Sequence, residues 1–184
     1  MPTPIGHSLG GIAAGWLTVA GVSGRGHRAV AACVLAAAGA APDLDLIVGI
    51  HRGPAHSVGA AAIAGAIAWA FARAKGLRSP VRWGLAIALA WGSHVLLDWL
   101  GTDTTPPIGV MALWPFSRAS YESDLHVFLA VSRRYWLPEF WRYNLREVRR
   151  ELLVLAPIAA LVVSLSATWP FRAYRRLAAS PRRP

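Results

Sequence analysis

Apolar residues run in five stretches along the chain, separated by short polar or arginine-rich segments. The stretches cover residues 9–22, 29–41, 58–71, 83–100 and 152–169. They are rich in alanine and glycine, the small residues that let membrane helices approach closely. No stretch alternates apolar and polar residues with a period of two, so the pattern predicts helices and no sheet. We therefore expect an all-α fold, a multi-span helical membrane bundle with a metal site at one membrane face.

The lengths of the stretches leave the number of spans open. Only the fourth and fifth approach the roughly 20 residues that a full span requires. The first two fit either buried core helices or spans lengthened at their ends, so we expect three to five spans. A chain of 184 residues has room for one domain. Within it we distinguish a membrane-embedded core, residues 1–130, from a C-terminal part, residues 131–184.

The C-terminal part opens with an amphipathic pattern after Pro138. Its apolar stripe and its basic residues fall on different sides of a helix. The stripe comprises Trp141, Leu145, Val148, Leu152 and Leu155, and the arginines largely off it are Arg142, Arg146, Arg149 and Arg150. We expect a helix lying at the membrane interface, bent at Pro157 into a last membrane helix that ends in a basic tail.

Composition agrees with a membrane protein. Hydrophobic residues make up 55% of the chain and the mean hydropathy is +0.41, which is high for a soluble protein. The formal net charge is +10. Its arginines cluster between apolar stretches, so membrane topology explains them better than nucleic-acid binding does. The basic tail has few interleaved aromatic residues, and nucleic acid is an unlikely partner.

The basic segments also predict an orientation. They fall after the first, third and fifth stretches, and if all five stretches cross, these segments share the cytoplasmic side. Their members are Arg25 and Arg28, then Arg73, Lys75, Arg78 and Arg82, then Arg172, Arg175, Arg176, Arg182 and Arg183. The segment 101–150 would lie on the other side despite its arginines, because acids offset much of their charge and long loops obey the rule poorly.

Seven ionisable side chains lie at the edges of the first four stretches, all on the predicted non-cytoplasmic face. Such groups near hydrocarbon are costly unless they pair, face water or bind a metal. Imidazoles and carboxylates are ligands of zinc and similar divalent ions, with manganese as an alternative. A single cysteine excludes a thiolate cluster. The seven are His7, Asp43, Asp45, His51, His56, His94 and Asp98.

The individual motifs each allow a second interpretation. His94 and Asp98 are four apart and share a helix face, so they fit one metal or a hydrogen-bonded pair equally well. Asp43 and Asp45 either cap the next helix or supply one inward carboxylate and one supporting partner. The turn from His51 to His56 is a weak signal alone. What favours a metal is the joint order and common side of these residues.

The ordered motifs resemble a known family. Together with Trp114-Pro115-Phe116-Ser117, the seven residues are similar to the pattern of YdjM-type inner-membrane metal-dependent hydrolases. These resemble in turn the all-helical zinc-dependent phospholipase C and single-strand nuclease superfamily. The resemblance covers roughly residues 3–117. It implies that one Asp of the 43/45 pair, His56, His94 and Asp98 hold one metal. It also implies that His7 lies near a second metal through Asp98, with His51 as a further ligand or supporting group.

The chain departs from the family pattern in three places. Ala55 stands where family members usually have threonine, and the segment 101–108 is longer than usual. Soluble relatives also carry later ligands for a third zinc. Glu122 and His126 are the nearby candidates here, and we interpret both as surface or interface groups.

These observations predict an integral protein of a bacterial-type inner membrane that hydrolyses a phosphoester or phospholipid with metal-activated water. Asp43 or Asp45 is the general-base candidate. Arg52 either clamps a phosphate or forms a salt bridge to Asp43 or Asp45. The expected partners are the lipid bilayer and a small-molecule or lipid substrate, with the oligomeric state left open. The alternative is a non-catalytic membrane protein that binds or senses metal through the same cluster.

Overall fold

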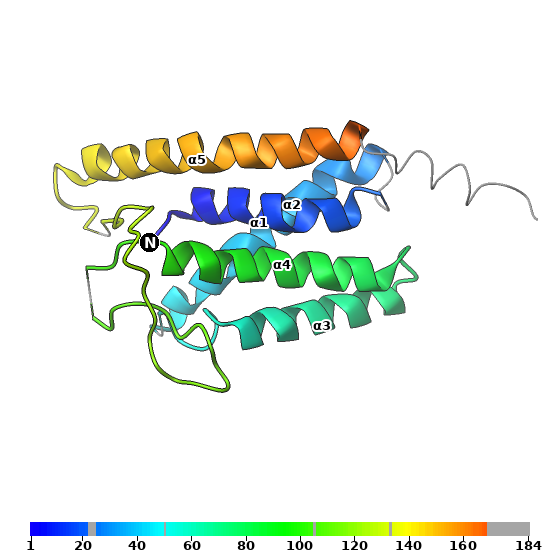
Figure 1. Cartoon of the computed structure of the whole chain (residues 1–184), viewed down its shortest axis with the longest axis horizontal. Helices are drawn as coiled ribbons and strands as arrows, with labels where there is room; N and C mark the ends of the chain where they lie inside the picture. The colour runs from blue at the N-terminus through cyan, green and yellow to red at the C-terminus, as the bar shows by residue number, and fades with distance from the viewer. Residues whose placement is uncertain (22–24, 50, 105, 133, 169–184) are drawn as a thin grey trace, which may run out of the picture.

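Five α-helices form an antiparallel bundle in the computed structural model (Figure 1). The structure describes residues 1–21, 25–49, 51–104, 106–132 and 134–168, and within them it contains no strand. The expected all-α class is confirmed. The helices are α1 (Pro4–Val19), α2 (Arg28–Ala40), α3 (Val58–Ala74), α4 (Pro80–Trp99) and α5 (Phe140–Thr168), with the 3-10 helices η1 (Arg25–His27) and η2 (Ala41–Val48) before and after α2.

Local sequence signals set the start of the helices that carry the site. Thr3 caps α1 by accepting a hydrogen bond from the Gly6 amide, and Pro4 occupies the first helical turn. Helix α1 therefore begins before the apolar stretch that predicts it, and His7 lies inside the helix. Ser57 caps α3 in the same way through the Ala60 amide, 3.0 Å away. Helix α3 thus begins at Val58, the first residue of the third apolar stretch.

A pair of glycines lets α1 and α2 cross at backbone contact. A Cβ on Gly39 would lie 2.4 Å from the carbonyl oxygen of His7, and a Cβ on Gly11 would lie 2.4 Å from that of Leu35. Real side-chain atoms do not approach backbone this closely, so both positions require glycine. The crossing brings the C-terminal end of α2 against the part of α1 that carries His7.

The interior of the bundle is small, and its outer surface is apolar. One core cluster joins Trp16, Leu35 and Ala90 from three different helices. Large apolar side chains on the outside are about half exposed or more, such as Ile67 on α3 and Leu161 on α5. An outer surface of this kind is typical of a protein surrounded by lipid.

Among the described residues, one helical stretch is long and apolar enough to cross a membrane, Arg28–Ile47. Val58–Ala74 is apolar but shorter. The number of spans stays a prediction. The basic tail lies outside the described residues, as does residue 169, the last of the fifth apolar stretch.

Helix α5 covers both the amphipathic segment and most of the fifth apolar stretch as one continuous element, with Pro157 inside it. It runs alongside α1 (Figure 1). Trp141 and Leu145 of the predicted stripe are exposed, whereas Leu155 of the same stripe is buried. Glu147 and Glu151, four residues apart on α5, are also buried. The interfacial helix and the last membrane helix stay predictions. The boundary at residue 130 stays a prediction.

Candidate metal centre

All seven predicted ligands lie at one end of the bundle. The start of α1 supplies His7, the end of α4 supplies His94 and Asp98, and η2 with the turn before α3 supplies the others. The alternating direction of the helices brings these ends together (Figure 1). Segments as much as 91 residues apart in the chain thus build one cluster.

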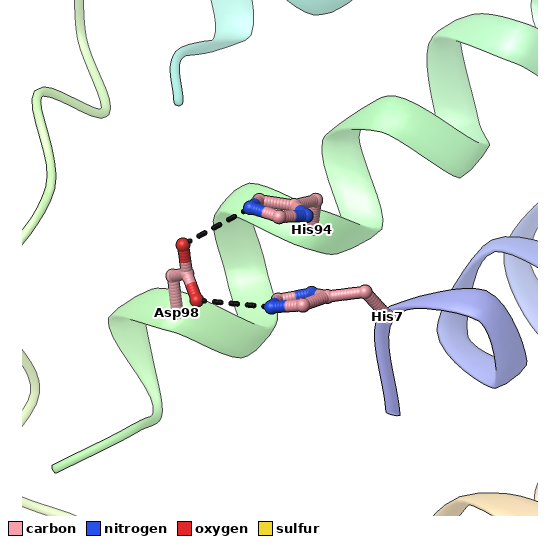
Figure 2. Close-up of side chains that lie close together, drawn as sticks. All are labelled: His7, His94 and Asp98. Atoms are coloured by element: carbon pink, nitrogen blue, oxygen red, sulfur yellow. Dashed lines mark ion pairs between the residues drawn. The ribbon is translucent and has the colours of Figure 1, made fainter. Parts of the chain in front are cut away.

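Asp98 connects two buried histidines (Figure 2). Its Oδ1 lies 3.2 Å from His7 Nε2, and its Oδ2 lies 3.2 Å from His94 Nε2. The two imidazole rings stack with centroids 3.6 Å apart. All three residues are buried, and their ligand atoms lie within 4.8 Å of one another, a spacing that could hold a metal ion.

A second group adjoins the first. Asp43, His51 and His56 also bring ligand atoms within 4.8 Å of one another. His56 Nε2 lies 3.6 Å from Asp43 Oδ1 and 3.5 Å from Asp98 Oδ2. His94 Nε2 lies 3.8 Å from the same Asp43 oxygen. The two groups are therefore one continuous cluster, joined through Asp43 and Asp98.

The spacing of four atoms in this cluster fits a divalent ion. Each histidine Nε2, of His56 and of His94, lies 3.2–3.8 Å from one oxygen of Asp43 and one of Asp98. Ligand atoms about 2.0–2.1 Å from a tetrahedral zinc lie roughly 3.3 Å apart. Both nitrogens and both Asp98 oxygens are buried without a hydrogen bond of good geometry. Such groups are costly to bury unless something they bind compensates.

Outer contacts orient both histidines toward the cluster. His94 Nδ1 lies 2.8 Å from the Gly39 carbonyl oxygen, to which it donates a hydrogen bond, so Nε2 is the inward nitrogen. His56 Nδ1 lies 3.1 Å from Asp45 Oδ2 and thus likewise presents Nε2. A carboxylate or carbonyl behind a ligating histidine is the usual support of a metal site. Asp43 is therefore the inward carboxylate of the pair, and Asp45 is the supporting one.

His51 lies at the edge of the cluster. Its Nδ1 lies 3.2 Å from Asp45 Oδ1, so Asp45 contacts both histidines of the turn. The side chains of Asp43, Asp45 and His51 are 18%, 11% and 13% exposed, whereas those of His56, His94 and Asp98 are closed off from solvent. The cluster is therefore open on the side of η2 and the turn.

Arg52 forms an ion pair with Asp103. Its guanidinium also donates to the Pro107 carbonyl oxygen at 2.8 Å. Arg52 has a positive φ of 66°, an uncommon conformation for a residue with a side chain. These contacts tie the turn carrying His51 and His56 to the long segment after α4. The insertion at 101–108, a departure from the family pattern, thus supplies the partner of Arg52.

The sequence interpretation missed two buried acids on α5. Glu151 accepts hydrogen bonds from the backbone amide and the hydroxyl of Thr3, at the positive N-terminal end of α1. Burial raises the pKa of Glu147 above its ordinary value, while the nearby backbone of Leu129 opposes this effect. Their spacing of four, on an otherwise arginine-rich helix, is the signal that could have identified them. Glu151 thus anchors the helix end that presents His7.

The later candidates Glu122 and His126 are placed elsewhere. Glu122 accepts a hydrogen bond of 2.8 Å from the Asp103 amide, and His126 is exposed. Within the described part of the chain, neither belongs to a group that could hold a metal. His126 thus lies at the surface, whereas Glu122 is half-buried.

We expect the two aspartates of η2 to differ in their effect on metal binding. Asp43→Asn should remove a ligand and abolish stoichiometric zinc binding. Asp45→Asn should keep the stoichiometry and weaken affinity by about 10–100-fold, because only the orientation of His56 is lost. Titration of the detergent-purified apoprotein with zinc measures both. Retention of zinc by Asp43→Asn together with its loss from Asp45→Asn would reverse the assignment.

A comparison with protein families identifies the family of the chain. The family model described as YdjM inner membrane protein matches residues 1–173. The chain belongs to the YdjM inner membrane protein family. Comparison with curated proteins and with solved structures found no match. The family description indicates that this YdjM chain is an inner membrane protein. Its His/Asp groups could bind metal.

Proposed function

We propose that this YdjM chain is an integral membrane hydrolase that cleaves phosphoester bonds with a divalent metal, zinc first and manganese second. The single observation that carries the proposal is the convergence of two imidazoles and two carboxylates at distances of 3.2–3.8 Å. Nitrogen and oxygen ligands of this kind are typical of hydrolytic zinc sites. The resemblance to the phospholipase C and nuclease superfamily supports the same chemistry.

Each side chain has a role in this proposal. Asp43, His56, His94 and Asp98 would hold the metal. His7, whose Nε2 lies 3.2 Å from Asp98 Oδ1, would hold a second one together with Asp98. A divalent ion there would supply Lewis acidity and activate water near neutral pH. Asp45 keeps His56 oriented. At the open side of the cluster, where it also contacts His51, Asp45 would accept a proton as the general base.

Arg52 has a positioning role in this scheme. Its ion pair with Asp103 keeps the turn between η2 and α3 in place, which sets the spacing of His51 and His56. Phosphate therefore approaches from the exposed side of Asp43, and not through a guanidinium clamp.

The proposal places the cluster at the non-cytoplasmic face of a multi-span protein. The basic residues of η1 and of the α3–α4 connection lie at the end of the bundle opposite the cluster (Figure 1). Positively charged loops favour the cytoplasmic side. Residues 152–168 of α5 carry no charged side chain, which allows this part of the helix to cross the bilayer.

The second candidate is a protein that binds or senses metal without turnover. The near-complete burial of His7, His94 and Asp98 favours it, since a storage or sensor site requires no access for substrate. The partial exposure of Asp43 and its position at one end of the bundle favour the hydrolase. Turnover decides between the two.

The test joins metal content to hydrolysis. Detergent-purified protein is loaded with zinc or manganese, analysed for metal, and assayed with bis(p-nitrophenyl) phosphate and a panel of phospholipids, beside the double variant His94→Ala/Asp98→Ala. The proposal expects about one or two metals per chain and hydrolysis, both lost in the variant. Metal bound without hydrolysis supports the sensor. Equal metal in both proteins, or none in folded wild type, overturns both functions.

A further inference from the structure

An apolar groove of about 1100 Å³ runs along the bundle beside the metal cluster. Its walls come from α2, through Val30 and Val34, and from α3, through Ala64 and Ala68. Helix α4 forms the floor with residues such as Ile87, because α2 and α3 both pack against α4. Known small-molecule sites occupy about 300–1000 Å³, so this groove has room for a large ligand.

One end of the groove adjoins the open side of the cluster. Pro54 and Ala55 line the groove, and the next residue is His56 of the metal cluster. Trp91, on the groove floor, donates a hydrogen bond of 2.8 Å from its indole nitrogen to the Ala55 carbonyl oxygen. The same turn begins at the partly exposed His51. A single turn thus separates the entrance of the cluster from the groove.

The length and polarity of the groove fit one hydrocarbon chain. On α3 it extends from Ala60 to Ala72, a rise of about 18 Å. The hydrocarbon depth of one leaflet is about 15 Å, half of the bilayer core. The groove is apolar over this length, and its basic lining residues, His27 and Arg78, lie at the far end. An extended chain that starts at the cluster therefore meets only apolar walls until it reaches mid-membrane.

We infer that the groove between α2 and α3 binds an acyl chain of the substrate, a phospholipid of the leaflet on the cluster side, whose phosphate reaches the metal centre. Hydrolysis of the bound phospholipid rests on the proposed hydrolase function, whereas binding of the lipid in the groove is independent of turnover. Because apolar contacts hold the acyl chain, the groove selects a lipid by its chain length and not by its headgroup.

Photolabelling tests the site without turnover. Full-length protein is reconstituted in phosphatidylglycerol vesicles that contain a phosphatidylglycerol with a diazirine near the end of one acyl chain. After illumination, label is mapped by mass spectrometry on the tryptic peptides 53–73, which carries most of α3, and 151–172, which carries the apolar part of α5. The inference expects labelling concentrated in 53–73.

A matched pair of variants distinguishes the groove from the outer surface of α3. Ala68→Trp fills the groove, whereas Ala66→Trp adds the same side chain at an exposed position outside it. Labelling of 53–73 should fall by about fivefold or more in the first and stay unchanged in the second. Ala64→Phe is the second groove-filling variant, used if Ala68→Trp does not fold.

Kinetics tests the link to the metal centre. For any phospholipid headgroup that the wild type hydrolyses, Ala68→Trp should raise KM for the long-chain form by about tenfold and leave a dihexanoyl form with the same headgroup unchanged. Even labelling of both peptides, or equal effects of Ala66→Trp and Ala68→Trp, overturns the groove and leaves the hydrolase standing. Groove labelling without any hydrolysis keeps the lipid site and overturns the hydrolase. Capture of a second protein chain by the groove overturns the lipid occupant.

Discussion

Asp98→Asn is expected to lower metal affinity by at least about 100-fold and to abolish the proposed hydrolysis. The carboxylate lies 3.2 Å from the Nε2 atoms of both His7 and His94 and 3.5 Å from that of His56. No other residue of the cluster approaches three histidines through two oxygens. Asparagine keeps the shape but replaces one oxygen by an NH2 group that cannot bind a cation, and it removes the negative charge, so both proposed metal positions are impaired together.

Metal analysis and zinc titration of the purified variant measure this effect. Asp124→Asn is the matched control, because Asp124 is exposed and the substitution is chemically identical. It should retain the metal content of the wild type. Circular dichroism establishes that both variants remain helical. Zinc affinity of a folded Asp98→Asn variant within about threefold of wild type would contradict the assigned centre.

Gly39→Ala is expected to destabilise the protein by about 3 kcal/mol or more, the upper range for an overpacked interior. The added Cβ would lie 2.4 Å from the His7 carbonyl oxygen and 2.9 Å from the Cα of Gly11. Both are backbone atoms, so no rotamer change relieves the clash and α1 must move away from α2. The Gly39 carbonyl oxygen also accepts the hydrogen bond of His94. Metal affinity should therefore fall together with stability.

Thermal unfolding in detergent measures the first effect, expected as a lowering of Tm by about 6–12 °C for a chain of this size. Gly92→Ala is the control. A Cβ there meets nothing within 4 Å in the middle of α4, and alanine favours a helix over glycine. Its Tm should stay equal or rise. Equal stability of Gly39→Ala and Gly92→Ala would show that the α1–α2 crossing is not as close as described.

The sequence identified the seven residues of the cluster because ionisable groups beside hydrocarbon are costly unless they pair, face water or bind a metal. Those groups were recognisable by residue type and by their place at the edges of apolar stretches. The alternating order of the helices then placed them all at one end, as the basic segments had indicated. The helical class followed from local periodicity, which depends on near neighbours in the chain.

Tertiary contacts decided what each of these residues does. The distinction between Asp43 and Asp45 required the ring positions of His56 and His94, which come from other segments. The partner of Arg52 lies 51 residues away, in a segment whose pattern carries no pairing signal. The burial of Glu151 on α5 could not be read from its own helix, because its hydrogen-bond partner is Thr3 at the N-terminal end of α1. A sequence pattern indicates which polar groups need a partner when they are buried. Only the tertiary structure decides which residue becomes that partner.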